Sequence, residues 1–218
     1  MKRVTIKGFM ICRRLVLVLG LCALGACSLP KQPPVEPTSW IVSPERTATP
    51  FAQRSEFWLK VGAVSVSPTF AGRSLVYRLG DQHYEKDFYN IYAVSPAEMI
   101  GNAERQWLNN ANIFAMTVGQ SNSFFPLYTL QASVDDFYGD YRVKPEAVVT
   151  VEFFLTVTNA GKTNPLIGRN RYTKRIALKD NTPQALVQGQ QQALAEILQD
   201  YETALFHYAA KLPKPLGE

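Results

Sequence analysis

The fold is decided by residues 127–157, which read LYTLQASVDDFYGDYRVKPEAVVTVEFFLTV. Apolar and polar side chains alternate from Leu127 to Tyr138, and this period of two predicts a strand with one buried face. Residues 147–157 carry an apolar side chain at every odd position, so they predict the most deeply buried strand of the chain. An Asn-Ala-Gly-Lys turn at residues 159–162 leads to a strand over 166–178, which we expect to return antiparallel.

The strands expected before this segment are shorter. Phe57 to Val66 is apolar on both faces, which is typical of a strand with neighbours on each side. Residues 75–79 and 82–89 flank a Gly-Asp turn and predict a hairpin. One further short strand is expected over Ile113 to Val118.

Two helices are predicted. Ser95 can cap the first turn of a helix in which Pro96 takes the first position and Glu98 completes a capping box. Apolar residues then recur on one side for about 14 residues. The second helix is expected from Thr182-Pro183 to about Lys211, and Gly189 weakens it by about 1 kcal/mol relative to Ala.

The expected element order is β-β-β-α-β-β-β-β-α. This order predicts an α+β fold, in which two helices pack on one face of a largely antiparallel sheet. We expect a single domain over residues 56–213, followed by a tail at 214–218.

The N-terminus resembles a bacterial lipoprotein signal peptide, residues 1–26. Basic residues come first, and the apolar run from Leu15 to Ala26 is too short to span a bilayer. The run ends in Leu-Gly-Ala-Cys, residues 24–27, which resembles the lipobox whose cysteine is acylated and becomes the new N-terminus. We therefore expect Cys27 to anchor the mature chain to a membrane. An ordinary secretory signal with a chance cysteine is the alternative.

Residues 27–55 are expected to be a tether, because six prolines in this stretch disfavour helix and sheet. Trp40-Ile41-Val42 is a candidate edge segment that docks on the domain. Ser28, in place of Asp, favours sorting to the outer membrane, with the domain on its periplasmic face. Cys12 and Cys22 lie in the signal peptide, so we expect no intramolecular disulfide, no metal or redox cluster and no cofactor.

The positive net charge of +5 lies in the signal peptide. Residues 1–26 contain five basic residues and no acidic one, which leaves 18 basic and 18 acidic residues in the rest of the chain. A neutral mature chain offers no electrostatic basis for binding nucleic acid.

Candidate catalytic residues are few. His83 and His207 are expected at the surface, without a Cys or His at metal-ligand spacing. The sequence has no phosphate loop, nucleophile elbow or dinucleotide fingerprint. Residues 135–141, DDFYGDY, predict a strand end turning through Gly139, because the alternating ligands of a calcium loop are missing. Residues 87–92, DFYNIY, are interpreted as core and turn, with a lipid-binding slot as the alternative.

A basic face is expected on the strand over residues 166–178. Arg169, Arg171 and Arg175 share one side of it, and no acidic residue occurs between Phe153 and Lys179. Charges on a solvated sheet edge discourage aggregation, which is one interpretation. The other is a contact with an acidic partner or with lipid headgroups.

Several motifs occur in a characteristic order and spacing: LVYR (75–78), YE (84–85), DFYN (87–90), Pro96, WL (107–108), Phe114, YGDYR (138–142) and the strand 148–155. With the lipobox and the long last helix, they resemble the ABC-type transport auxiliary lipoprotein family over most of Phe57 to Leu212. The resemblance implies no catalytic residue. The resemblance implies that the protein is an auxiliary component of an MCE-type lipid transporter. Its partners would then be a periplasm-spanning MCE protein and an ABC permease and ATPase. Some members form rings, so a homo-oligomer is also open.

The leading hypothesis is a non-enzymatic outer-membrane lipoprotein that assists lipid transport between the two membranes, with phospholipid as the expected cargo. A structural or assembly lipoprotein of the cell envelope shares every anchor feature and is the alternative. A periplasmic hydrolase would need a polar constellation that the sequence does not display.

Overall fold

The computed structural model describes residues 36–52, 55–157, 166–209 and 211–212. The chain divides into two units, residues 1–36 and 37–218, and the fold below belongs to the second. Its described residues form eight strands and two helices. These are β1 (Thr38–Trp40), β2 (Ser55–Val66), β3 (Ser74–Arg78), β4 (Tyr84–Tyr92), α2 (Pro96–Ala111), β5 (Phe114–Val118), β6 (Tyr128–Asp140), β7 (Glu146–Val157), β8 (Leu166–Ala177) and α3 (Pro183–Ala209).

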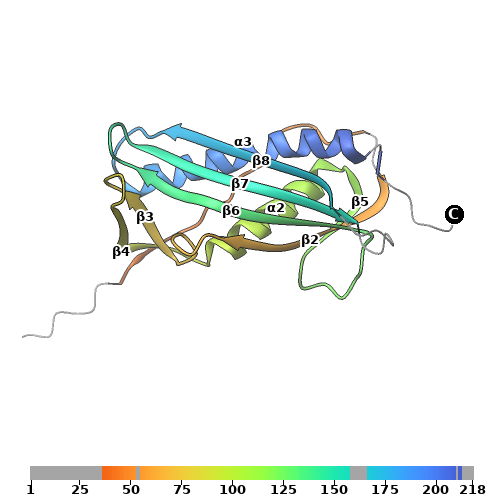
Figure 1. Ribbon diagram of the computed structural model, residues 1–218, viewed down its shortest axis with the longest axis horizontal. Helices are drawn as coiled ribbons and strands as arrows, with labels where there is room; N and C mark the ends of the chain where they lie inside the picture. The colour runs from red at the N-terminus through yellow and green to blue at the C-terminus, as the bar shows by residue number, and fades with distance from the viewer. Residues whose placement is uncertain (1–35, 53–54, 158–165, 210, 213–218) are drawn as a thin grey trace, which may run out of the picture. The chain divides into compact units, whose positions relative to one another are not determined.

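Strand β6 is the centre of the sheet (Figure 1). One edge of β6 pairs antiparallel with β7 along its whole length, and β7 pairs antiparallel with β8. The other edge is shared between two partners. Residues Tyr128 to Val134 pair with β2, which continues to β5, and residues Gly139 and Asp140 pair with β3, which continues to β4 and β1.

The α+β class is confirmed, but the sheet is mixed rather than largely antiparallel. The pairs β1–β4, β2–β5, β2–β6 and β3–β6 are parallel, whereas β3–β4, β6–β7 and β7–β8 are antiparallel as expected. For the pairs that join β2 or β3 to β5 or β6, the reason is the crossover that contains α2, because a long crossover returns the chain in its original direction. The β1–β4 pair is parallel because the chain from β1 crosses to β4 through β2 and β3.

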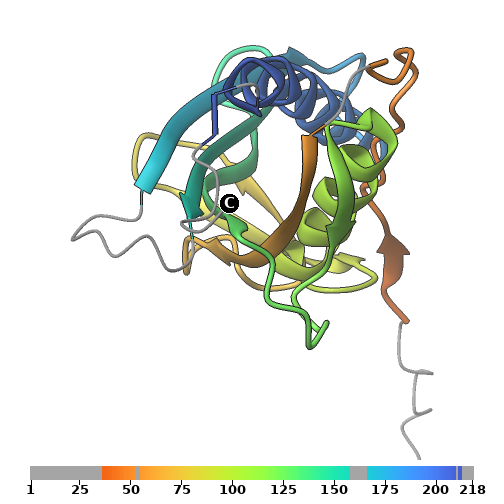
Figure 2. The same cartoon turned by 90° about the vertical axis from the view of Figure 1, so that its right-hand side faces the viewer.

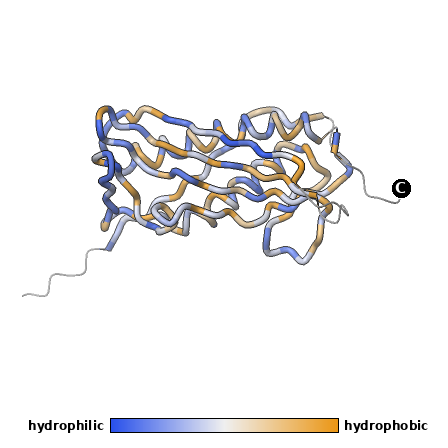
Figure 3. Tube along the Cα trace, viewed as in Figure 1, coloured by the Kyte–Doolittle hydropathy of each residue, from blue (hydrophilic) through white to orange (hydrophobic). Residues whose placement is uncertain are grey.

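Both helices cover the same face of the sheet, as expected. They lie behind it in Figure 1, and Figure 2 shows them beside each other from one end. Hydropathy alternates along the first half of β6, and β7 is apolar over most of its length (Figure 3). The side chains of Tyr128, Leu130 and Val134 in β6 are fully buried. Phe153 of β7 stacks on Tyr201 of α3 with ring centroids 4.0 Å apart.

The helix ends follow the expected capping chemistry. The Ser95 hydroxyl accepts a hydrogen bond from the Glu98 amide, and Pro96 is the first residue of α2. The helix ends where Asn112 takes a left-handed conformation with φ of 61°. At α3 the Thr182 hydroxyl accepts a hydrogen bond from the Ala185 amide.

Part of the segment expected as a tether lies on the domain. β1 pairs with β4, and Val42 is 1% exposed in the core. Further along, the Arg46 guanidinium lies 2.8 Å from a carboxylate oxygen of Glu202 on α3. The segment Thr38 to Val42 is therefore an edge of the folded unit, as the Trp40-Ile41-Val42 motif suggested.

Candidate functional site

The expected lipidation site and the expected basic face have different outcomes. Cys27 lies outside the described residues. Arg169, Arg171 and Arg175 lie on β8, the edge strand next to β7, and share the face of the sheet that points away from the helices.

Each of these arginines contacts a carboxylate on a neighbouring strand. Arg169 Nε donates to Glu152 Oε1 over 2.5 Å, and Arg171 pairs with Asp135. Arg175 pairs with both Asp140 and Glu146, at 2.8 and 2.7 Å. The face is therefore a ladder of alternating charges across three strands and not a basic patch. The arginines are about half exposed, whereas Glu152 and Asp140 are nearly buried, so removing an arginine would leave a buried carboxylate without its partner.

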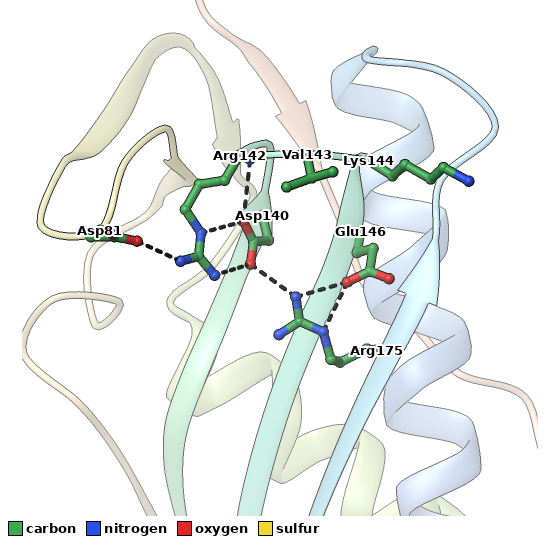
Figure 4. A pocket seen from close by; sticks show the side chains of 7 residues that line it. All are labelled: Asp81, Asp140, Arg142, Val143, Lys144, Glu146 and Arg175. Carbon is green, nitrogen blue, oxygen red and sulfur yellow. Dashed lines mark hydrogen bonds and ion pairs between the residues drawn. The ribbon is translucent and has the colours of Figure 1, made fainter.

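Asp140 lies at one end of this ladder, where two guanidinium groups contact its carboxylate (Figure 4). Its carboxylate accepts two hydrogen bonds from Arg142, at 3.0 and 2.9 Å, and one from Arg175 at 2.8 Å. Arg142 reaches on to Asp81, 2.8 Å away in the β3–β4 turn. The cluster thus ties three parts of the chain together: the β3–β4 turn, the end of β6 and the edge strand β8.

The electrostatics of the cluster indicate a permanent link between these parts of the chain, which we call the clamp. The hydrogen bonds from Arg142, and next those from Arg175, outweigh the burial of Asp140 and hold its pKa well below the usual range. A cavity of about 500 Å³ opens beside it, with Lys144 and the 92% exposed Val143 on its rim. Each carboxylate that lines this cavity contacts a guanidinium group, so the cluster positions loops.

A second carboxylate shapes β4. Five residue steps of β4, from Lys86 to Ile91, lie opposite two steps of β3, so β4 bulges between them. Asp87 organises this bulge: one oxygen accepts hydrogen bonds from the amides of Tyr89 and Asn90, and the other accepts one from the Tyr77 hydroxyl at 2.7 Å. Burial opposes ionisation of Asp87, but these hydrogen bonds prevail and lower its pKa.

The bulge places two aromatic side chains at the surface. Phe88 is 77% exposed and Tyr89 is 56% exposed, and their rings meet edge to face at 5.3 Å. The interpretation of residues 87–92 as core and turn therefore holds for Tyr92, which is buried, and for the turn at Asp87, but Phe88 and Tyr89 are at the surface. The bulge therefore presents both rings outward, and the lipid-binding slot stays an untested alternative.

A larger apolar surface lies at the opposite end of the sheet, where the β5–β6 loop projects (Figure 1). It comprises Trp58, Met116, Phe124 and Phe125, and Phe125 is 90% exposed. The Lys60 ammonium donates to the carbonyl oxygens of Asn122 and Phe124 and lies 5.6 Å from the Phe125 ring.

A groove of about 440 Å³ runs beside these rings. The sequence analysis did not single out this loop, although a Phe-Phe-Pro run between polar loop residues is a signal for exposed aromatic side chains. We call the four residues Trp58, Met116, Phe124 and Phe125 the distal patch.

Two buried carboxylates were also missed. Glu202 accepts hydrogen bonds from Trp107 Nε1 at 2.7 Å and from Arg46. Glu104 on α2 is only 1% exposed, and neither of its oxygens has a hydrogen-bond partner. Burial raises the pKa of Glu104 to about 8. A glutamate on the apolar side of an amphipathic helix was the signal available.

The remaining expectations concern the histidines, metal ligands and membrane-spanning helices. His83 and His207 are both exposed. Among the described residues, no three His, Cys, Asp or Glu side chains are grouped as metal ligands. Within the same residues, neither helix combines the length and the hydropathy that a bilayer crossing requires.

Comparison with solved structures shows the fold. A Xanthomonas campestris protein of the DUF330 family matches 81% of this chain and 95% of its own, with 15% identity and a TM-score of 0.63. A second structure, of an uncharacterized protein, matches 78% of this chain and 99% of its own, with 18% identity and a TM-score of 0.60. A hypothetical protein of Chlamydia trachomatis matches 72% of this chain and its whole own length, with 5% identity and a TM-score of 0.52.

Comparison with curated proteins gives no match. A family model, that of the ABC-type transport auxiliary lipoprotein component, matches residues 41–200. This range runs from the end of β1 to the last turns of α3 and so includes the Asp140 cluster, the β4 bulge and the distal patch. The chain belongs to the ABC-type transport auxiliary lipoprotein family, a membrane-anchored class of transport components.

Proposed function

We propose that this chain is a non-enzymatic, lipid-anchored subunit of an MCE/ABC-type transport system that carries lipid, with phospholipid as the expected class, between the inner and outer membranes. The observation that carries the proposal is the family match over residues 41–200, which spans almost the entire domain. The lipobox at residues 24–27 supports acylation of Cys27, and Ser28 favours the periplasmic face of the outer membrane.

The distal patch is the surface we assign to the protein partner. It lies at the end of the sheet away from β4. The folded unit begins at β1, which pairs with β4, so a domain anchored through its N-terminal side leaves the distal patch available to the periplasm. Its apolar side chains and its groove suit an apolar segment of the MCE protein, because exposed aromatic groups supply most of the binding energy at such contacts. The permease and ATPase would then be reached through that partner.

Two further expectations remain predictions. A homo-oligomer would be detected by light scattering of the detergent-solubilised protein. An acidic partner or lipid headgroups could contact Arg169, Arg171 and Arg175 only if these side chains left their present carboxylates. Replacing the three arginines should therefore weaken such binding chiefly at low salt.

The anchor is tested with Cys27→Ala. We expect the precursor to keep its leader and to incorporate no labelled fatty acid, whereas the unmodified chain gains the mass of a lipidated cysteine. Labelled fatty acid that still enters the variant would refute acylation at Cys27.

The partner is tested by affinity purification from solubilised membranes. The unmodified chain should recover MCE and ABC subunits, and Phe124→Ser/Phe125→Ser should recover markedly less while leaving lipidation unchanged. Leu79→Ser/Val143→Ser is the matched double control, because it removes two exposed apolar side chains at the other end of the sheet. Recovery of envelope assembly factors without any transport subunit would support the alternative class and contradict the proposal.

A further inference from the structure

The β4 bulge lies next to the point where the anchored segment enters the fold. β1 pairs parallel with β4, and Thr38 lies opposite Asn90. The folded unit begins at Pro37, immediately before this pair. It therefore begins beside the strand that carries the exposed rings of Phe88 and Tyr89.

The length of chain between Glu36 and Cys27 limits how far this end can stand from the anchor. Nine residue steps lead from Cys27 to Glu36, and nine steps span at most about 30 Å. The distal patch lies farther away, because β6 alone extends over 13 residues, or about 40 Å, between the two ends of the sheet. Whatever surface holds Cys27 is within reach of the β4 bulge and meets it before the distal patch.

The bulge also has the chemistry of a membrane-interface contact. Phe88 and Tyr89 are exposed by 77% and 56%, and Tyr89 carries a hydroxyl that can remain among headgroups while its ring is buried. Glu85, Lys86 and Asp87 give the bulge two acidic groups and one basic group, so the contact rests on the two rings and not on attraction to anionic lipid. The bonds of Asp87 to Tyr77 and to the bulge amides hold the loop in shape without a ligand.

We infer that Phe88 and Tyr89 are a membrane-contact site, through which the domain rests on the lipid surface that carries its own anchor. This inference depends on the proposed acylation of Cys27. Two aromatic side chains would bind a bilayer weakly by themselves. The anchor makes their contact intramolecular, with an effective concentration on the order of millimolar, and so makes a weak contact sufficient. The contact fixes the orientation of the domain and turns the distal patch away from the membrane.

The test uses the full lipoprotein, purified from membranes and reconstituted into vesicles of phosphatidylethanolamine and phosphatidylglycerol. The only cysteines of the chain are Cys12, Cys22 and Cys27, so the mature acylated chain has no free thiol. A single Phe88→Cys substitution therefore provides one site for an environment-sensitive fluorophore. Tyr89→Cys is a second reporter in the same bulge, and Phe125→Cys is the matched control in the distal patch.

We expect the labels at positions 88 and 89 to shift to the blue, to brighten severalfold and to be quenched by spin-labelled lipid, while the label at 125 remains in water. Vesicle flotation reports the anchor separately. A chain that floats while the labels at 88 and 89 stay in water would leave the anchor intact and overturn the inference. A label quenched at 125 and not at 88 would overturn it as well. A chain that does not float would overturn the proposed anchor together with this contact.

Discussion

Glu104→Gln should make the protein more stable at alkaline pH and leave it unchanged at acidic pH. Glu104 is buried on α2 with both oxygens unpartnered, and burial raises its pKa from 4.5 to about 8. In the unfolded chain the carboxyl ionises above pH 4.5, whereas in the folded chain it remains protonated until about pH 8. The folded state therefore binds one proton more in this window, and its stability falls as the pH rises through it.

The magnitude follows from the width of that window. Each pKa unit corresponds to about 1.4 kcal/mol, so the complete shift corresponds to roughly 4–5 kcal/mol of stability lost between the two pH limits. Glutamine has the shape of the protonated carboxyl and does not titrate. The variant should equal the unmodified protein near pH 4.5 and exceed it by about 4–5 kcal/mol near pH 8.

Urea unfolding followed by tryptophan fluorescence, at a series of pH values, measures this difference. With a urea dependence of about 1–3 kcal/mol per molar, the midpoint should move by more than about 1 M at pH 8. Glu56→Gln is the control for the chemical change itself, because Glu56 is exposed on β2. A constant difference between Glu104→Gln and the unmodified protein across the pH series would refute the reasoning.

Three other substitutions test the packing of the helices and the Asp140 cluster. Gly189→Ala should destabilise the protein by about 2–3 kcal/mol, because the new Cβ would lie 2.8 Å from the Ala147 Cβ of β7. Gly101→Ala should stabilise it by up to about 1 kcal/mol, because the new Cβ meets only the end of Val64 at 3.3 Å. Equal changes in urea midpoint for the two variants would contradict this account of α3. Asp140→Asn should cost about 2–3 kcal/mol at neutral pH. Because the pKa of Asp140 is lowered, that loss should shrink as the pH falls below the ordinary value of 3.8, and a loss independent of pH would count against the clamp.

The elements of this fold were predictable because their causes are local. The alternation in residues 128–134, the cap at Ser95 and the start at Thr182-Pro183 each depend on residues within one or two turns of chain. The observed β6, α2 and α3 therefore begin within a residue or two of the expected positions. The close approach of Gly189 to Ala147 was not visible, since the sequence shows only the weakened helix and not the strand that requires it.

The pairings were not predictable because they depend on register between distant segments. Counting charges along the chain between Phe153 and Lys179 finds no acid, yet the sheet brings Arg169 to Glu152 and Arg171 to Asp135. The β4 bulge was hidden for a similar reason. An aromatic run inside a hairpin suggests burial. Only the hydrogen bonds that the Asp87 carboxylate accepts from the amides of Tyr89 and Asn90 reveal the bulge that places two rings at the surface.

The residues that carried the resemblance to the family mostly satisfy one another within the chain. Tyr77 bonds to Asp87, Asp140 bonds to Arg142, and Tyr141 packs edge to face on Tyr77. The hydrogen bonds of Tyr77, Asp87 and Asp140 are made inside the domain, so these motif residues specify the shape of one end of the sheet. Among the described residues, the exposed rings of the β4 bulge and of the distal patch are available for recognition. Substitution of Tyr77, Asp87 or Asp140 should accordingly change the free energy of unfolding, while substitution of these exposed rings should change binding and leave stability nearly constant.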